Sequence, residues 1–200
     1  MVAIGHDALT ANTTAGNNVA VGAYAGAATT TGDSNVFVGY EAGKVNTTGY
    51  GNGAIGLRAM DAVTTGIYNN SMGYSALSAL TTGNDNTGIG NQSLEAVTTS
   101  SENTALGAHA GDSITTGSNN TCIGFEADAS SATADNEITL GNSSVTKLRV
   151  PGLNSFEIND SGQFSGVAST ASGTAGVRKI TASTSAPSGG SDGDLWVVYS

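Results

Sequence analysis

The sequence predicts an all-β protein, a β-solenoid of nine 17-residue repeats followed by a small β-rich C-terminal module. The first supporting observation is an aliphatic–glycine pair that returns every 17 residues, without insertion or deletion, from Ile4–Gly5 to Leu140–Gly141. The second is composition: Gly, Thr, Ser and Asn make up 96 of the 200 residues, and Gly, Thr and Asn disfavour helices. Leu, Ile, Val and Phe number only 37, which is too few for a conventional core. Stacked coils solve this problem, because each coil needs only one or two inward apolar residues.

Each repeat is expected to contain two short strands and two turns. Residues 18–22 exemplify the first strand and residues 79–83 the second, and each ends at a glycine that tolerates positive φ. The residue directly before each repeat glycine is predicted to point inward and form the structural core: Ile4, Val21, Val38, Ile55, Met72, Ile89, Leu106, Ile123 and Leu140. Three residues of the second strand are expected to join this core: Leu80, Val97 and Ile114.

An asparagine column keeps the same register, thirteen residues after the repeat glycine, and fails only at Glu137. Its members are Asn18, Asn35, Asn52, Asn69, Asn86, Asn103 and Asn120. Asparagine accepts left-handed backbone geometry at a corner, and its amide can bond to the coils above and below. We therefore expect a structural asparagine ladder rather than a ligand site.

Charge divides the chain after the repeats. The predicted shaft, residues 1–141, carries two bases and twelve acids, whereas the remainder carries four of each. Residues 142–165 are predicted to form a strand, over 145–150, and a hairpin that cap the solenoid edge. Residues 166–176 have the composition of a linker, and residues 177–200 are expected to form the C-terminal module from two strands. Its Trp196 is either a packing residue or a docking anchor, because amphipathic aromatic residues dominate interfaces.

The repeats resemble two known families. Asn-Thr-Ala-Leu-Gly at residues 103–107 is similar to the units of trimeric autotransporter adhesin heads. Thr-Thr-Gly-Asn-Asp-Asn-Thr-Gly-Ile-Gly at residues 81–90 resembles, more fully, the repeat of bacteriophage tail-fibre proteins, especially those of marine cyanophages. Either resemblance implies a left-handed parallel β-roll, usually an intertwined homotrimer. The segments at residues 140–152 and 186–196 resemble the stretches that follow such repeats in phage fibres, and the sequence shows neither a signal peptide nor a C-terminal barrel anchor, so the viral family is favoured.

Composition and motifs argue against several classes of function. Six Lys and Arg against sixteen Asp and Glu leave no basic surface for nucleic acid. No apolar run is long enough to span a membrane. The lone Cys122 and two separated histidines do not make a metal site, and no catalytic or cofactor motif is present. Asp7, Glu41 and Glu126 share a column but fall in distant coils, so we expect no enzymatic activity and no cofactor.

The sequence therefore predicts a non-enzymatic virion protein, a tail-fibre or spike component for host-surface attachment, exposed on the outside of the particle. The expected partners are copies of itself in a homotrimer, other virion proteins and host-surface glycan. Capsid decoration and a bacterial adhesin head are alternatives. An ice-binding solenoid is a weaker one, because adjacent threonines of a strand would face opposite sides. The aromatic residues expected to recognise a surface are Tyr24, Tyr40, Tyr74 and Phe125, and Tyr50 and Tyr68 also interrupt the small-residue surface.

Overall fold

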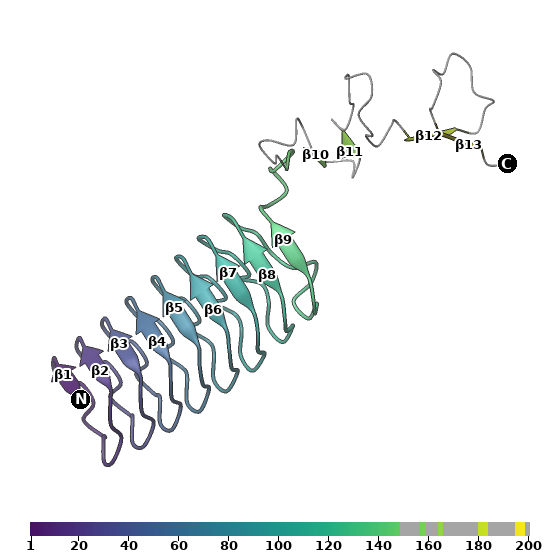
Figure 1. Cartoon of the computed structure of the whole chain (residues 1–200). Helices are drawn as coiled ribbons and strands as arrows, with labels where there is room; N and C mark the ends of the chain where they lie inside the picture. The colour runs from purple at the N-terminus through teal and green to yellow at the C-terminus, as the bar shows by residue number, and fades with distance from the viewer. Residues whose placement is uncertain (149–156, 159–163, 166–179, 184–194, 199–200) are drawn as a thin grey trace, which may run out of the picture. The chain divides into compact units, whose positions relative to one another are not determined.

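The computed structural model describes residues 1–148, 157–158, 164–165, 180–183 and 195–198. The chain divides into two compact units, Met1–Asn142 and Ser143–Ser200. The first unit is a parallel β-solenoid whose coils have the predicted 17-residue spacing, and no helix occurs in the described residues (Figure 1). We call this unit the shaft.

One nine-stranded parallel sheet runs along the shaft, and each strand pairs with the strand of the next coil. The strands are β1 (Val2–Ile4), β2 (Val19–Val21), β3 (Val36–Val38), β4 (Gly53–Ile55), β5 (Asn70–Met72), β6 (Thr87–Ile89), β7 (Thr104–Leu106), β8 (Thr121–Ile123) and β9 (Ile138–Leu140). Paired residues are 17 apart, as in Val19↔Val36, so equivalent side chains stack in columns. The predicted solenoid and its register are confirmed.

The second predicted strand of each coil does not form. In the threonine pair of the second coil, the amides of Thr30 and Thr31 both donate to the carbonyl oxygen of Thr47, at 3.0 and 3.3 Å. Two consecutive amides that share one acceptor cannot continue a strand ladder, in which acceptors alternate along the chain. Each coil therefore has a single strand, and bends and turns complete its circuit.

The predicted core column faces the wrong way. Nearly all of these residues are well exposed in the single chain, from 38% for Ile89 to 59% for Ile4, and Val21 and Val38 are half-buried. In strands β2 to β8 the inward residue is the middle one, directly before that column: Ala20, Phe37, Ala54, Ser71, Gly88, Ala105 and Cys122. Small residues fit here because larger side chains reach the interior from the turns, among them Leu77 and Leu94. The expectation for Leu80, Val97 and Ile114 is confirmed, since all three are fully buried.

The interior stays closely packed because a large side chain in the strand is combined with small residues in the turns, and a small strand residue with a large turn residue. Phe37 is the largest fully buried side chain, and a Cβ atom at Gly26 or Gly43 would collide with its ring. The equivalent turn position holds Met60 or Leu77 in coils whose strand residue is small. A large strand residue is thus matched by glycine in the adjoining turns, as close packing requires.

The inward position of Cys122 predicts an unreactive thiol. Burial, followed by the nearby carboxylates of Asp128 and Glu137, raises the pKa of Cys122 to about 11. At pH 8 only about one thiol in a thousand is then ionised, and the thiolate is the reactive form. We expect the folded chain to resist the thiol reagent dithiobisnitrobenzoate until the pH approaches 11 and to react fully after unfolding. A Ser113→Cys variant, with its added thiol on the surface, should show one reactive thiol in the folded state. If Cys122 of the native chain reacted as fast as this surface thiol, its inward position would be contradicted.

The asparagine ladder forms as predicted, and all seven side chains are buried. In the coil of Asn69, the Nδ2 group donates to the carbonyl oxygen of Gly83 at 2.8 Å, and Oδ1 accepts from the amide of Asn86 at 3.0 Å. The left-handed geometry expected for these asparagines belongs instead to the residue before each of them, such as Tyr68 with φ of 57°. The turn therefore precedes the ladder residue, whose side chain then points into the shaft.

The second unit contains two small strand pairs. Strands β10 (Glu157–Ile158) and β11 (Phe164–Ser165) pair antiparallel, in agreement with the predicted hairpin, and β12 (Ile180–Ser183) pairs parallel with β13 (Leu195–Val198). Residues 145–148 do not form the predicted strand. The linker at residues 166–176, the hairpin turn and the side chain of Trp196 lie outside the described residues.

Candidate functional site

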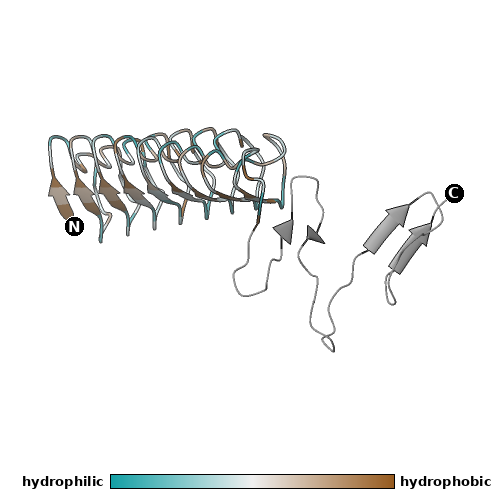
Figure 2. Ribbon diagram, turned by 90° about the horizontal axis from the view of Figure 1, so that it is seen from above, coloured by the Kyte–Doolittle hydropathy of each residue, from teal (hydrophilic) through white to brown (hydrophobic). Residues whose placement is uncertain are grey.

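The first candidate surface is the outer face of the nine-stranded sheet. Because the middle residue of each strand points inward, the first and third residues point outward, and we call these eighteen positions the outer sheet face. Nine of them form the aliphatic column from Ile4 to Leu140, and none of the eighteen is charged. Hydrophobic segments recur along the row of strands in Figure 2. The acidic shaft thus keeps every charge off this face, whose third-residue column is aliphatic and whose first-residue column includes Asn70, Thr87, Thr104 and Thr121.

A second surface follows the turns, where side chains two and five residues after the repeat glycine form one polar pair in several coils. The pairs are Glu41–Lys44 at 2.7 Å, Arg58–Asp61 at 2.8 Å, Gln92–Glu95 at 2.6 Å and His109–Asp112 at 3.0 Å. The backbone explains their meeting, because the first residue of each pair has positive φ, for example 58° at Glu41, and turns the chain back on itself. We call this row the pair ladder.

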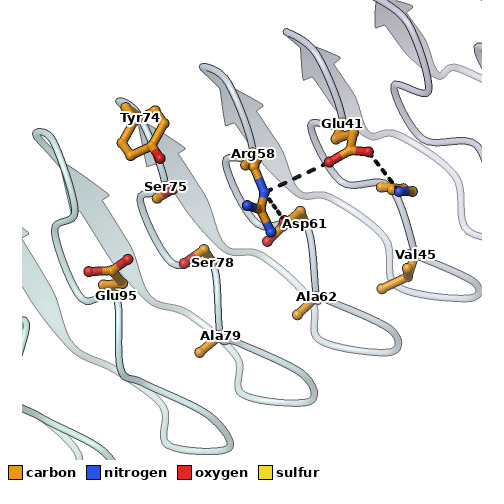
Figure 3. Close-up of a pocket in the computed structure, with 11 residues that line it drawn as sticks. Glu41, Val45, Arg58, Asp61, Ala62, Tyr74, Ser75, Ser78, Ala79 and Glu95 are labelled. Atoms are coloured by element: carbon orange, nitrogen blue, oxygen red, sulfur yellow. Dashed lines mark hydrogen bonds and ion pairs between the residues drawn. The ribbon is translucent and has the colours of Figure 1, made fainter.

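The fifth coil interrupts the pair ladder. Its two positions hold Ser75 and Ser78, whose side chains are too short to fill the row, and a hollow of about 650 Å³ lies there. Figure 3 shows Arg58 and Glu95 on opposite sides of these serines, with Tyr74 at the rim. We call this feature the coil-five hollow.

Ion pairs fix the charged side of the hollow. Lys44 donates to one carboxylate oxygen of Glu41, and Arg58 bonds to Asp61 and lies 3.8 Å from the other Glu41 oxygen. The hydrogen bond from Lys44 is the main reason that the pKa of Glu41 lies below its usual value, and the same bond raises the pKa of Lys44. Lys44 and Arg58 are the two bases of the predicted shaft, and both lie here beside carboxylates.

The predicted recognition residues do not form one site. Tyr24 is half-buried between His6 and Tyr40, and the centroid of its ring lies 5.3 Å from that of His6 and 6.1 Å from that of Tyr40. Phe125 packs against His109 of the neighbouring coil, several coils away from Tyr24. Of the four, only Tyr74 lines the coil-five hollow. Tyr50 and Tyr68 form a separate edge-to-face pair at 5.2 Å.

The threonine pairs place both residues at the surface, contrary to the expectation that they would face opposite sides. The second of each pair is exposed: Thr14, Thr31, Thr48, Thr65, Thr82, Thr99 and Thr116. The hydroxyl of the first residue is not available to a ligand, because it donates to a backbone carbonyl of the next coil, as Thr47 does to Thr64 at 3.0 Å. The surface therefore offers one column of free hydroxyls rather than two.

Sequence reasoning missed both candidate surfaces. The outer sheet face was hidden because its aliphatic column was interpreted as the core. The coil-five hollow had a readable signal, since Ser75 and Ser78 break a column pattern of longer polar residues that Arg58, Gln92 and His109 maintain.

Within the described residues, no group of three or more His, Cys, Asp or Glu side chains is placed to hold a metal ion, and no helix is long and apolar enough to cross a membrane. Comparison of the chain with protein-family models, curated protein sequences and solved structures found no match.

Proposed function

We propose that the chain is a non-enzymatic shaft component of a viral tail fibre or spike, which assembles as a homotrimer and presents attachment surfaces away from the particle. The repeat resemblance to phage fibres and the regular stack of coils support this role. The carboxylates that line the coil-five hollow are each held by a neighbouring side chain, which favours a binding surface over a catalytic one.

The outer sheet face carries this proposal. Seven of the nine residues in its aliphatic column expose between 38% and 59% of their surface in the single chain, and the column runs along the stacked strands. Contiguous exposed apolar side chains of this kind mark an interaction surface. A second and third copy are the occupants we favour, because they bring a face with the same spacing between strands.

Charge placement supports self-association. Each shaft carries a formal charge of −10 at residues 1–141, so copies repel one another wherever their acidic surfaces meet. The outer sheet face avoids this repulsion because it contains no ionisable side chain. It is therefore the surface on which copies can meet at the lowest electrostatic cost.

The finer features of the proposal follow the resembled families. We propose a left-handed β-roll, a cap from residues 142–165, and a module at residues 177–200 that docks on other virion proteins through Trp196. Host-surface glycan is the proposed receptor class.

Sedimentation velocity combined with light scattering tests the assembly. We expect an elongated particle of about 59 kDa, three chains of 19.6 kDa each. The triple variant Ile55→Ser, Met72→Ser and Ile89→Ser removes apolar area from three adjacent coils and should sediment as a monomer with an unchanged circular dichroism spectrum.

The matched control is Thr65→Ser, Thr82→Ser and Thr99→Ser, which changes exposed residues of the same coils and should remain trimeric. A native monomer would overturn the proposed fibre, and a triple variant that stays trimeric would overturn the outer sheet face as its interface.

A further inference from the structure

We propose that the coil-five hollow binds a neutral saccharide ring, for which Tyr74 supplies the stacking surface and Arg58, Asp61 and Glu95 supply hydrogen bonds. This inference deepens the proposed attachment role and rests on it for its biological meaning. It names a single site per chain, because the pair of serines occurs in this coil alone.

The size and the three chemical edges of the hollow fit a sugar. Its volume of about 650 Å³ lies within the range of about 300–1,000 Å³ typical of small-molecule sites. Tyr74 stands at one edge with half of its surface exposed, and Ser75 and Ser78 lie between Arg58 and Glu95. The third edge is apolar and consists of Val45, Ala62 and Ala79. A pyranose has the same character, with C–H groups that pack on aromatic and aliphatic surfaces and hydroxyls around its rim.

The polar side chains are held in place yet keep hydrogen-bonding capacity. Arg58 uses Nε to bond Oδ2 of Asp61, so its terminal amino groups remain available as donors. Gln92 bonds Oε2 of Glu95, which leaves the second oxygen of that carboxylate as an acceptor. Sugar hydroxyls both donate and accept, and therefore match a site that offers fixed donors and acceptors together.

Charge selects a neutral ligand. The lining contains three carboxylates, on Glu41, Asp61 and Glu95, against two bases, on Lys44 and Arg58, so the hollow has a net negative charge. Both bases already pair with carboxylates, and the shaft around them is acidic. A phosphate or an acidic sugar would be repelled, whereas a neutral hexose meets no such penalty.

The test is saturation-transfer NMR on the full chain with the methyl glycosides of glucose, galactose, mannose and N-acetylglucosamine, and with glucuronic and sialic acids as anionic comparators. We expect saturation of at least one neutral glycoside, with a dissociation constant on the order of a millimolar, as suits a ligand of one ring. The anionic sugars should show background signal only.

Two variants test the location of binding. Tyr74→Ala removes the stacking ring and should reduce saturation to background, while Tyr40→Ala, two coils away in the same column and outside the hollow, should leave it unchanged. The double variant Ser75→Gln and Ser78→Glu grafts the pair of the next coil into the hollow and should also abolish binding. Ser75 and Gln92 have nearly the same φ, 50° and 54°, so the graft suits the backbone.

The inference is overturned if no neutral glycoside is saturated, if binding survives both Tyr74→Ala and the graft, or if the anionic sugars bind instead. These outcomes are separable from failure of the proposed fibre, because oligomeric state is measured independently. A trimer that binds no glycoside rejects the saccharide site alone, and a monomer that binds one rejects the fibre alone.

Discussion

Replacing Gly73 with alanine is expected to lower the free energy of unfolding of the shaft by about 4 kcal/mol, through backbone strain and overpacking together. Gly73 has φ of 143°, a conformation that residues with a side chain rarely adopt. A Cβ atom there would meet the carbonyl group of Gly90 and lie 2.6 Å from its carbon atom. The obstacle is backbone of the next coil, which is held by the hydrogen bond from the Gly90 amide to Met72 at 2.8 Å and cannot move aside.

Gly16→Ala is the matched control, because a Cβ atom there meets nothing within 4 Å. Its effect should stay within about 0.5 kcal/mol, as for most surface substitutions. Thermal unfolding followed by far-ultraviolet circular dichroism, at one fixed chain concentration, compares the two. Equal midpoints for Gly73→Ala and Gly16→Ala would refute the role assigned to the repeat glycines.

Replacing Asn69 with alanine should destabilise the shaft by about 3–5 kcal/mol, since buried polar groups lose their partners at about 1–3 kcal/mol each. The carbonyl oxygen of Gly83 loses its donor, and the amide of Asn86 loses the Oδ1 acceptor at 3.0 Å. Oδ1 of Asn52 also loses a donor at 3.2 Å. The damage therefore extends to the coils on both sides.

Asn91 provides the control, since it has the same side chain but lies exposed in a turn outside the outer sheet face. Asn91→Ala should leave the free energy of unfolding within about 0.5 kcal/mol of the native value. Urea unfolding of both variants measures the difference. If both substitutions have the same effect, the ladder contributes no more than an exposed asparagine does.

The repeat by itself determined the architecture. A 17-residue period without insertions fixes which residues stack, so the parallel register followed from the column of repeat glycines. The buried asparagine ladder followed as well, because an amide repeated at one spacing can satisfy itself from coil to coil. Leu80, Val97 and Ile114 were recognisable as interior residues because each is the aliphatic residue directly before a threonine pair, at the same position of the repeat.

The candidate site was predicted only in part. Tyr74 was among the expected recognition residues, but its partners Arg58, Asp61 and Glu95 were not, because they come from different coils and meet across a gap. That gap arises because Ser75 and Ser78 are too short to fill the row, and although the sequence shows this break in the column, only the stacked coils show that a hollow results.

Only the tertiary structure decided which face of each strand lies inside. Alternation along a strand has a period of two, and the columns of Ala54 and Ile55 both contain residues suited to an interior. The choice between them is made where the coil closes. Turn residues such as Leu77 already fill the interior, so the smaller side chain must face them and the aliphatic one must face outward. The 17-residue period is thus a property of the sequence, whereas the volume available inside the closed coil decides which residues of each strand point inward.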